Sequence, residues 1–146
     1  MSNSAEVPDL QILAAIADAV IFADTDGVVR HWNDGAHAVF GFAQSEALGQ
    51  NLDLIVPEEL REAHWRGFDA ALERGATTGG RRARLTKGLH ADPDRALYVE
   101  MSFALVYDAD GAVAGSVAVA RDVTERHLKA REERAARRRA AAATNE

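Results

Sequence analysis

The sequence predicts an α+β domain in which helices cover one face of a five-stranded antiparallel sheet. Three observations lead to this fold class. Two β-branched and aromatic runs flank a tight turn at 24–27, which indicates a hairpin near the N-terminus. An amphipathic helical pattern follows over 57–74. Three further strands are expected beyond it, at roughly 81–89, 97–107 and 113–121.

The first elements follow from short-range patterns. Apolar residues recur every third or fourth position over 10–17, which predicts a short helix after a flexible stretch at 1–9. The two hairpin strands are expected at 19–23 and 28–32, because both runs are rich in residues that favour strands.

Two short helices are expected to connect the hairpin to the long helix. Asn33 or Asp34 can cap the first, which would continue through Phe40. Ser45 can begin the second, with Glu46 in its first turn.

The long helix carries a histidine where a core aliphatic residue is expected. Its inward stripe reads Leu60, His64, Phe68, Ala71 and Leu72. Pro57 suits the first turn and Gly75 suits the position after the last. A buried imidazole requires a hydrogen-bonding partner or a metal. The residues alone leave both open, and a core histidine bonded to a carbonyl is the ordinary case.

The strand expected at 97–107 gives the sheet one apolar face. Its alternating apolar residues are Leu97, Val99, Met101, Phe103 and Leu105. Successive side chains of a strand point to opposite faces, so these five share one. A second tight turn at 108–111 joins this strand to the last one.

Length and composition indicate one globular domain over 10–125, followed by a C-terminal helix and frayed tail at 126–146. The chain has 146 residues and is 47% hydrophobic, which is enough for a core. It contains no run long enough to cross a membrane and no signal peptide, so we expect a cytoplasmic protein. With no cysteine, disulfides, thiolate metal sites and chromophores attached through a thiol are excluded.

Charge is distributed unevenly along the chain. The net charge is −6, but 126–146 holds seven Lys or Arg against three Glu, so that 1–125 carries −10. An acidic body is a poor binder of nucleic acid. The basic tail is expected to be a solvated face, or to contact an acidic partner.

Several motifs, taken in order, resemble a PAS sensory domain over about 10–125. These motifs are Asp-Thr-Asp-Gly at 24–27, Trp32-Asn33, Phe40-Gly41, Gly-Gln-Asn at 49–51, Val56-Pro57, and Arg-Asp-Val-Thr-Glu at 121–125. The resemblance implies the PAS fold, and because that fold hosts many ligands, function must come from the site.

A finer resemblance is to haem-binding PAS domains of the oxygen-sensing histidine kinase type. Pro57, Arg61, His64, Gly67 and Phe68 fill the pattern that surrounds the family's proximal histidine. The resemblance implies that His64 binds the iron of haem b in a pocket between the long helix and the sheet. A neutral imidazole is a common haem ligand. The pocket walls implied by the family are Phe68, Met101, Phe103, Val117 and Val119.

The resemblance also implies a distal arginine at Arg84, but strand alternation leaves its direction open. If Arg84 faces the pocket, Arg82 and Thr86 face it too. The opposite register would bury Ala83 and Leu85 and leave Arg84 in solvent. Arg82 is a plausible substitute for Arg84. The remaining histidines are weak candidates for iron; they are His31, His37, His90 and His127.

Two functions follow from the resemblance. The first is an enzyme similar to the stand-alone haem PAS protein N-nitroglycine lyase. In this reading the chain would use ferrous haem and Arg84 to break down a small nitramine and release nitrite. The second is a sensor of diatomic gases that signals through Asp122-Val-Thr124 and the tail helix to a separate output protein. A homodimer is expected in either case. A cofactor-free dimerisation module is the third reading.

Overall fold

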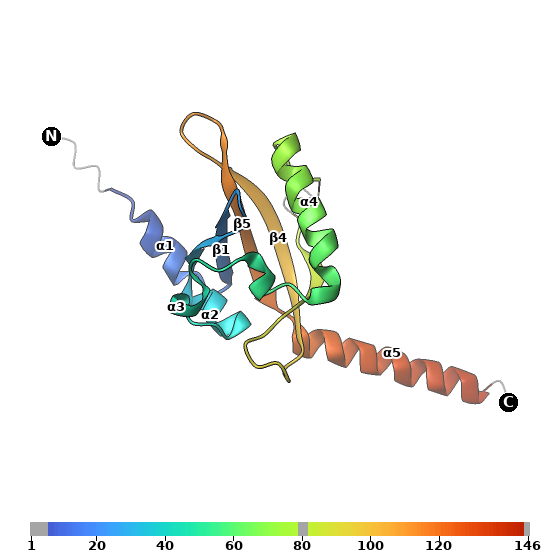
Figure 1. Cartoon of the computed structure of the whole chain (residues 1–146). Helices are drawn as coiled ribbons and strands as arrows, with labels where there is room; N and C mark the ends of the chain where they lie inside the picture. Colours follow the sequence, from blue (N-terminus) through green and yellow to red (C-terminus); the bar gives the residue numbers. More distant parts are fainter. Residues whose placement is uncertain (1–5, 79–81, 145–146) are drawn as a thin grey trace.

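The computed structural model describes residues 6–78 and 82–144. Five antiparallel strands form one sheet in the order β2-β1-β5-β4-β3, and the helices between β2 and β3 cover one of its faces (Figure 1). The predicted α+β class and the five-stranded sheet are confirmed. The elements are α1 (Asp9–Ala15), β1 (Ala19–Asp24), β2 (Val29–Trp32), α2 (Asp34–Phe40), α3 (Gln44–Ala47), the 3-10 helices η1 (Leu52–Leu54) and η2 (Glu58–Leu60), α4 (Arg61–Arg74), β3 (Arg84–Gly88), β4 (Leu97–Tyr107), β5 (Val113–Asp122) and α5 (Thr124–Thr144).

The turn between β1 and β2 is built on Asp24. Its Oδ1 accepts hydrogen bonds from the backbone amides of Asp26 at 3.0 Å and Val28 at 3.1 Å. Gly27 has a φ of 78°, in the left-handed region that glycine adopts without a steric penalty. The turn lies where the sequence predicted it.

Asn33 caps α2 and also fixes the segment before β1. Its Oδ1 accepts from the amides of Ala36 and Val20, both at 2.8 Å. Its Nδ2 donates to three backbone carbonyls, including those of Leu13 and Ile16 at 3.1 Å. Asn33 is only 4% exposed, so this full set of partners offsets the cost of burying an amide.

The second short helix begins earlier than predicted. Ala43, rather than Ser45, is the N-cap of α3, and Glu46 accepts a hydrogen bond from the Ala43 amide at 2.9 Å. The reciprocal half of a capping box therefore forms without a hydroxyl residue at the cap.

The predicted helix at 57–74 is divided in two. Pro57 precedes the 3-10 helix η2, and the α-helix itself starts at Arg61. Gly75 ends α4 with a φ of 75°, as its position predicted. The hydroxyl of Tyr107, at the end of β4, donates to the Gly75 carbonyl at 2.6 Å. The C-terminal end of α4 is thereby tied to the sheet.

The core lies between the inner face of the sheet and the covering helices. Its largest fully buried side chains are Trp32, Phe40, Ile21, Leu97, Val29 and Val99. The Trp32 indole donates to the carbonyl of Phe42 at 2.9 Å, so its polar edge is satisfied.

The third strand begins later than predicted. β3 starts at Arg84, with Arg82 and Ala83 outside the strand, and position 81 lies outside the described residues. The last strand continues one residue further than predicted, to Asp122.

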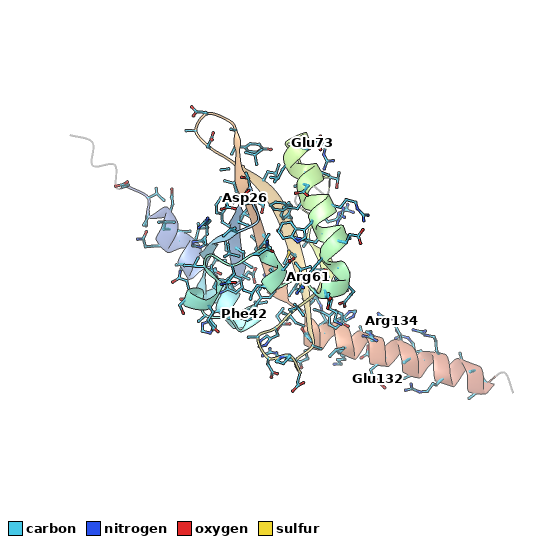
Figure 2. All side chains as sticks on the ribbon, in the orientation of Figure 1. Asp26, Phe42, Arg61, Glu73, Glu132 and Arg134 are labelled. Atoms are coloured by element: carbon cyan, nitrogen blue, oxygen red, sulfur yellow. The ribbon has the colours of Figure 1, made fainter. Side chains whose placement is uncertain are left out.

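The tail is a helix through Thr144 that buries no side chain and projects from the domain (Figure 1). Glu132 and Arg134 lie on its projecting part, away from the sheet (Figure 2). Among residues 6–78 and 82–144, no helix combines the length and the apolar character needed to cross a bilayer.

Candidate functional site

A cavity lies between α4 and the inner face of the sheet. It has two adjoining lobes of about 350 and 330 Å³, a size typical of ligand sites. The walls common to both lobes are Ala63, His64, Thr86, Met101 and Phe103. The first, which we call the apolar lobe, is also lined by core residues such as Ile21, Phe40 and Val99. The second, the arginine lobe, also includes Arg74, Arg82 and Arg84.

His64 lies on the wall between the two lobes. Its Nδ1 is buried and has no hydrogen-bond partner among the described residues. Burial lowers the pKa of His64 below its ordinary value of 6.5, while the Asp53 carboxylate opposes this shift. The imidazole is therefore neutral at neutral pH, which is the form that binds a metal.

The environment of His64 fits haem. The His64 ring lies on the wall shared by both lobes, so it could bind the iron of a haem placed in the cavity. The apolar lobe suits a large hydrophobic macrocycle. No group of three His, Cys, Asp or Glu that could hold a metal ion occurs within 6–78 and 82–144.

Phe68 packs one helical turn beyond His64. It is 3% exposed and lines the arginine lobe. Its ring is stacked with the His64 ring at 6.2 Å between centroids and meets Phe103 of β4 at 6.3 Å. Phe68, Met101 and Phe103, which the family resemblance implies as pocket walls, lie together at the arginine lobe.

The pairing of β3 with β4 decides the direction of Arg84. Arg84 lies opposite Met101 and Thr86 lies opposite Val99. Directly opposed residues in an antiparallel pair share a face, so Arg84 is on the cavity side. Leu85 is 52% exposed on the other side. Of the two registers that the sequence allowed, the structure has the one with Arg84 inward.

Val117 and Val119 were wrongly expected to line the pocket. They lie opposite Ala104 and Ser102, on the outer face of the sheet. The cavity is lined by Ala118 and Ser116 instead, because alternation along β5 gives adjacent residues opposite faces.

Trp65 packs against the core and also makes a polar contact with η1. Its Nε1 donates to Oδ1 of Asp53 in η1 at 2.7 Å. The ring lies against Gly27, where an added Cβ would come within 2.3 Å of the indole. Arg61, at the start of α4, also donates to the Asp53 carbonyl at 3.3 Å (Figure 2). These contacts fix the end of α4 that carries His64.

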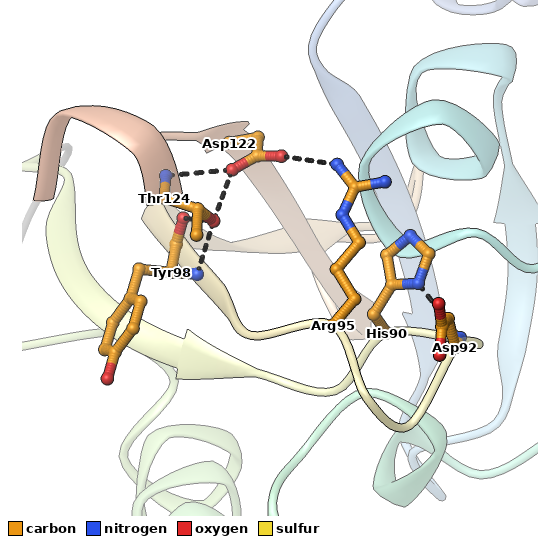
Figure 3. A network of polar contacts seen from close by, with 6 residues as sticks. All are labelled: His90, Asp92, Arg95, Tyr98, Asp122 and Thr124. Carbon is orange, nitrogen blue, oxygen red and sulfur yellow. Dashed lines mark hydrogen bonds and ion pairs between the residues drawn. The ribbon is translucent and has the colours of Figure 1, made fainter. Parts of the chain in front are cut away.

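A second polar network forms where β5 meets α5 (Figure 3). Asp122 Oδ1 accepts from the Thr124 amide at 2.9 Å and from its hydroxyl at 2.6 Å. The Tyr98 amide in β4 donates to the Thr124 hydroxyl at 2.9 Å. Arg95 forms an ion pair with Asp122 at 3.5 Å. The start of α5 is therefore held by the strand that also lines the cavity.

The other histidines lie outside the cavity lining. His90 is engaged locally, since its Nδ1 accepts from the Asp92 amide at 3.0 Å. His127 stacks on Tyr98 with ring centroids 4.3 Å apart. His37 is exposed on α2, and His31 lies opposite Phe22 in the β1–β2 pair.

Comparisons with known proteins agree with this architecture. A family model described as the PAS fold matches residues 13–128. The sensor protein FixL of Bradyrhizobium diazoefficiens is 36% identical over 67 residues, which is 46% of this chain and 12% of that protein. The chain therefore spans only a small part of this relative.

Solved structures are similar in fold at low identity. A PAS domain from Colwellia psychrerythraea superposes with a TM-score of 0.69 at 20% identity, covering 80% of this chain and 95% of that one. A light-oxygen-voltage domain studied with a flavin analogue has a TM-score of 0.63 at 19% identity, covering 91% and 97%.

Proposed function

This chain belongs to the PAS family, and from that premise we propose that it binds one haem b through His64 and senses a diatomic gas there. The observation that carries the proposal is the place of the His64 imidazole on the wall that the two lobes of the cavity share. The similarity to the sensor protein FixL supports sensing as the function.

Each part of the cavity has a role in this proposal. Haem iron, when bound, supplies an open coordination position for a gas molecule. His64 contributes a neutral imidazole, and the apolar lobe excludes water. Arg84 can donate a charge-assisted hydrogen bond to a polarised ligand, so that it discriminates between ligands of different polarity.

Flavin is a less suitable cofactor for this chain. The structural similarity to a flavin-binding light-oxygen-voltage domain is one of fold, at 19% identity. Light sensing through a flavin–thiol bond requires a cysteine, and the sequence has none.

The junction of β5 and α5 supports an output role. Met101 and Phe103 of β4 line the cavity, while Tyr98 of the same strand holds Thr124 at the start of α5. A ligand that displaces β4 would shift the tail helix. We propose that α5 passes this change to a partner protein, with the chain acting as a homodimer.

A second candidate is haem-dependent breakdown of a small nitramine, with Arg84 as a catalytic residue. The arginine lobe favours it, because three guanidinium groups suit an anionic substrate. The relatives described above favour sensing, which therefore comes first. Nitrite release from an N-nitro amino acid by the purified, dithionite-reduced protein would establish the enzyme instead.

Absorption spectroscopy tests the haem proposal. The haem-reconstituted protein should bind one haem per chain and show a Soret band that shifts on reduction. His64→Ala should lose most of the haem. The matched control is His37→Ala, which removes an exposed imidazole from α2 and should leave the spectrum unchanged. Retention of haem with an unaltered spectrum in His64→Ala would exclude His64 as the ligand.

A further inference from the structure

Trp65 connects His64 to two other segments of the domain. Its ring meets the His64 ring edge-on at 4.8 Å between centroids. The same indole donates to Asp53 at 2.7 Å and lies over Gly27 in the turn between β1 and β2. Asp53 and Gly27 therefore hold the indole in place. The indole in turn packs against one side of the imidazole.

The first turn of α4 depends on the same segment. Leu60, the N-cap of α4, provides no side-chain cap, so the helix start is held from outside. Arg61 donates to the carbonyls of Val56 at 3.1 Å and Asp53 at 3.3 Å. Its Nε also lies 3.9 Å from Asp53 Oδ1. Asp53 therefore contacts two residues of α4, Arg61 and Trp65.

The charge of Asp53 lies close to His64. Its carboxylate accepts a hydrogen bond from the indole whose ring meets the His64 ring edge-on. The Asp53 side chain is 39% exposed, so solvent screens part of this interaction. Residues that contact the ligands of a metal orient those ligands and influence the reduction potential of the metal.

We propose that Asp53 is a positioning residue for His64, which fixes the imidazole through Trp65 and stabilises positive charge on a group bound there. The orientation part stands on the geometry of the protein alone. The charge part rests on the proposed haem function, since it concerns the oxidation state of bound iron.

Two substitutions separate these parts. Trp65→Phe keeps an aromatic ring but removes the N–H donor. Asp53→Asn keeps an oxygen that can accept from the indole but removes the charge. Asp69→Asn is the matched control, because it removes the same charge from an exposed position on α4.

The orientation part is tested in haem-free protein by NMR. The Trp65 indole proton should resonate downfield, and the nuclear Overhauser contacts of the His64 ring with cavity residues should change in Trp65→Phe but stay as in the wild type in Asp69→Asn. Unchanged contacts of the His64 ring in Trp65→Phe would overturn this part.

The charge part is tested by the reduction potential of the haem-loaded protein. Asp53→Asn should favour the ferrous form up to tenfold, or about 59 mV for one electron. Asp69→Asn should shift the potential much less. Equal shifts in the two variants would overturn the charge part. Absence of haem from the wild-type protein would remove both the proposed function and the charge part, while the NMR result would still decide the orientation part.

Discussion

Arg84 and Met101 face each other across the β3–β4 pair, so a guanidinium and a thioether lie on the same face of the sheet. Both line the arginine lobe beside His64. This relationship gives Arg84 access to a ligand in the cavity and directs Leu85 toward solvent. Substitutions at Arg84 and at Leu85 should therefore have different effects on ligand affinity.

Replacing Arg84 with alanine should weaken ligand binding without loss of haem. A charge-assisted hydrogen bond contributes about 1.5–3 kcal/mol, so oxygen affinity should fall roughly tenfold to a hundredfold. Any nitramine turnover should fall by a similar factor. Haem content should stay constant, because His64 is untouched. The measurement is gas titration of the reduced, haem-loaded protein.

Two neighbouring substitutions are the controls for Arg84→Ala. Arg82→Ala removes a second cation of the arginine lobe, and Leu85→Ala alters an outward side chain. Leu85→Ala should leave both haem content and affinity unchanged. Loss of haem in Leu85→Ala together with wild-type affinity in Arg84→Ala would contradict the observed register.

Filling the cavity should compete with haem. Ala118 lies opposite Phe103 and lines the apolar lobe, whereas Ala104 lies opposite Val117 on the outer face. Ala118→Leu should therefore lower haem affinity roughly fivefold to a hundredfold, because overpacking of a filled site costs about 1–3 kcal/mol. Ala104→Leu, with the same added volume, should bind haem like the wild type. Titration of haem-free protein with haemin, followed at the Soret band, measures both.

The sequence predicted the fold well because its signals were local. The turn at 24–27, the cap at Asn33 and the stop at Gly75 each depend on a few neighbouring residues, and all three are present in the structure. The alternation of β4 likewise predicted that Met101 and Phe103 share the cavity face.

The predictions that failed at the cavity concern how separate segments pack against one another. Alternation defines two faces within β5 but not which face meets the helices. Both faces carry apolar residues, so Val117 and Val119 were as plausible as Ala118. The Trp65–Asp53 contact was missed for a related reason: these residues are twelve positions apart, and no sequence pattern joins an indole to a particular carboxylate.

The turn that supports Trp65 should depend on pH. Desolvation raises the pKa of Asp24, but hydrogen bonds from Arg30 and from the amides of Val28 and Asp26 lower it below 3.8 overall. Because the folded pKa is lower than the unfolded one, Asp24 stabilises the fold above the unfolded pKa, and this stabilisation is lost as pH falls through the folded value. Asp24→Ala should cost about 1 kcal/mol at pH 7.

Denaturant unfolding at several pH values tests this effect. The difference between wild type and Asp24→Ala should shrink as the pH falls below about 4. Asp26→Ala is the control, since it removes an exposed carboxylate from the same turn. A difference for Asp24→Ala that stays constant down to pH 3 would contradict the role of the ionised carboxylate.

The expected homodimer should depend more on the N-terminal segment than on the tail. α1 exposes Leu10 at 67% and Ile12 at 48%, and the outer face of the sheet carries Val117 and Val119. Apolar surface of this kind favours association. By contrast, α5 is mostly charged, with Leu128 as an isolated exposed apolar side chain, and it is too short in heptads for a strong coiled coil.

Deleting residues 1–17 should therefore weaken dimerisation at least about tenfold, and deleting 130–146 should change it less than about threefold, by sedimentation. The N-terminal deletion also removes Leu13 and Ile16, whose carbonyls accept from Asn33. The double variant Leu10→Ser and Ile12→Ser keeps those carbonyls and should reproduce most of the effect. If the tail deletion dissociates the dimer while the double variant does not, the interface lies along α5.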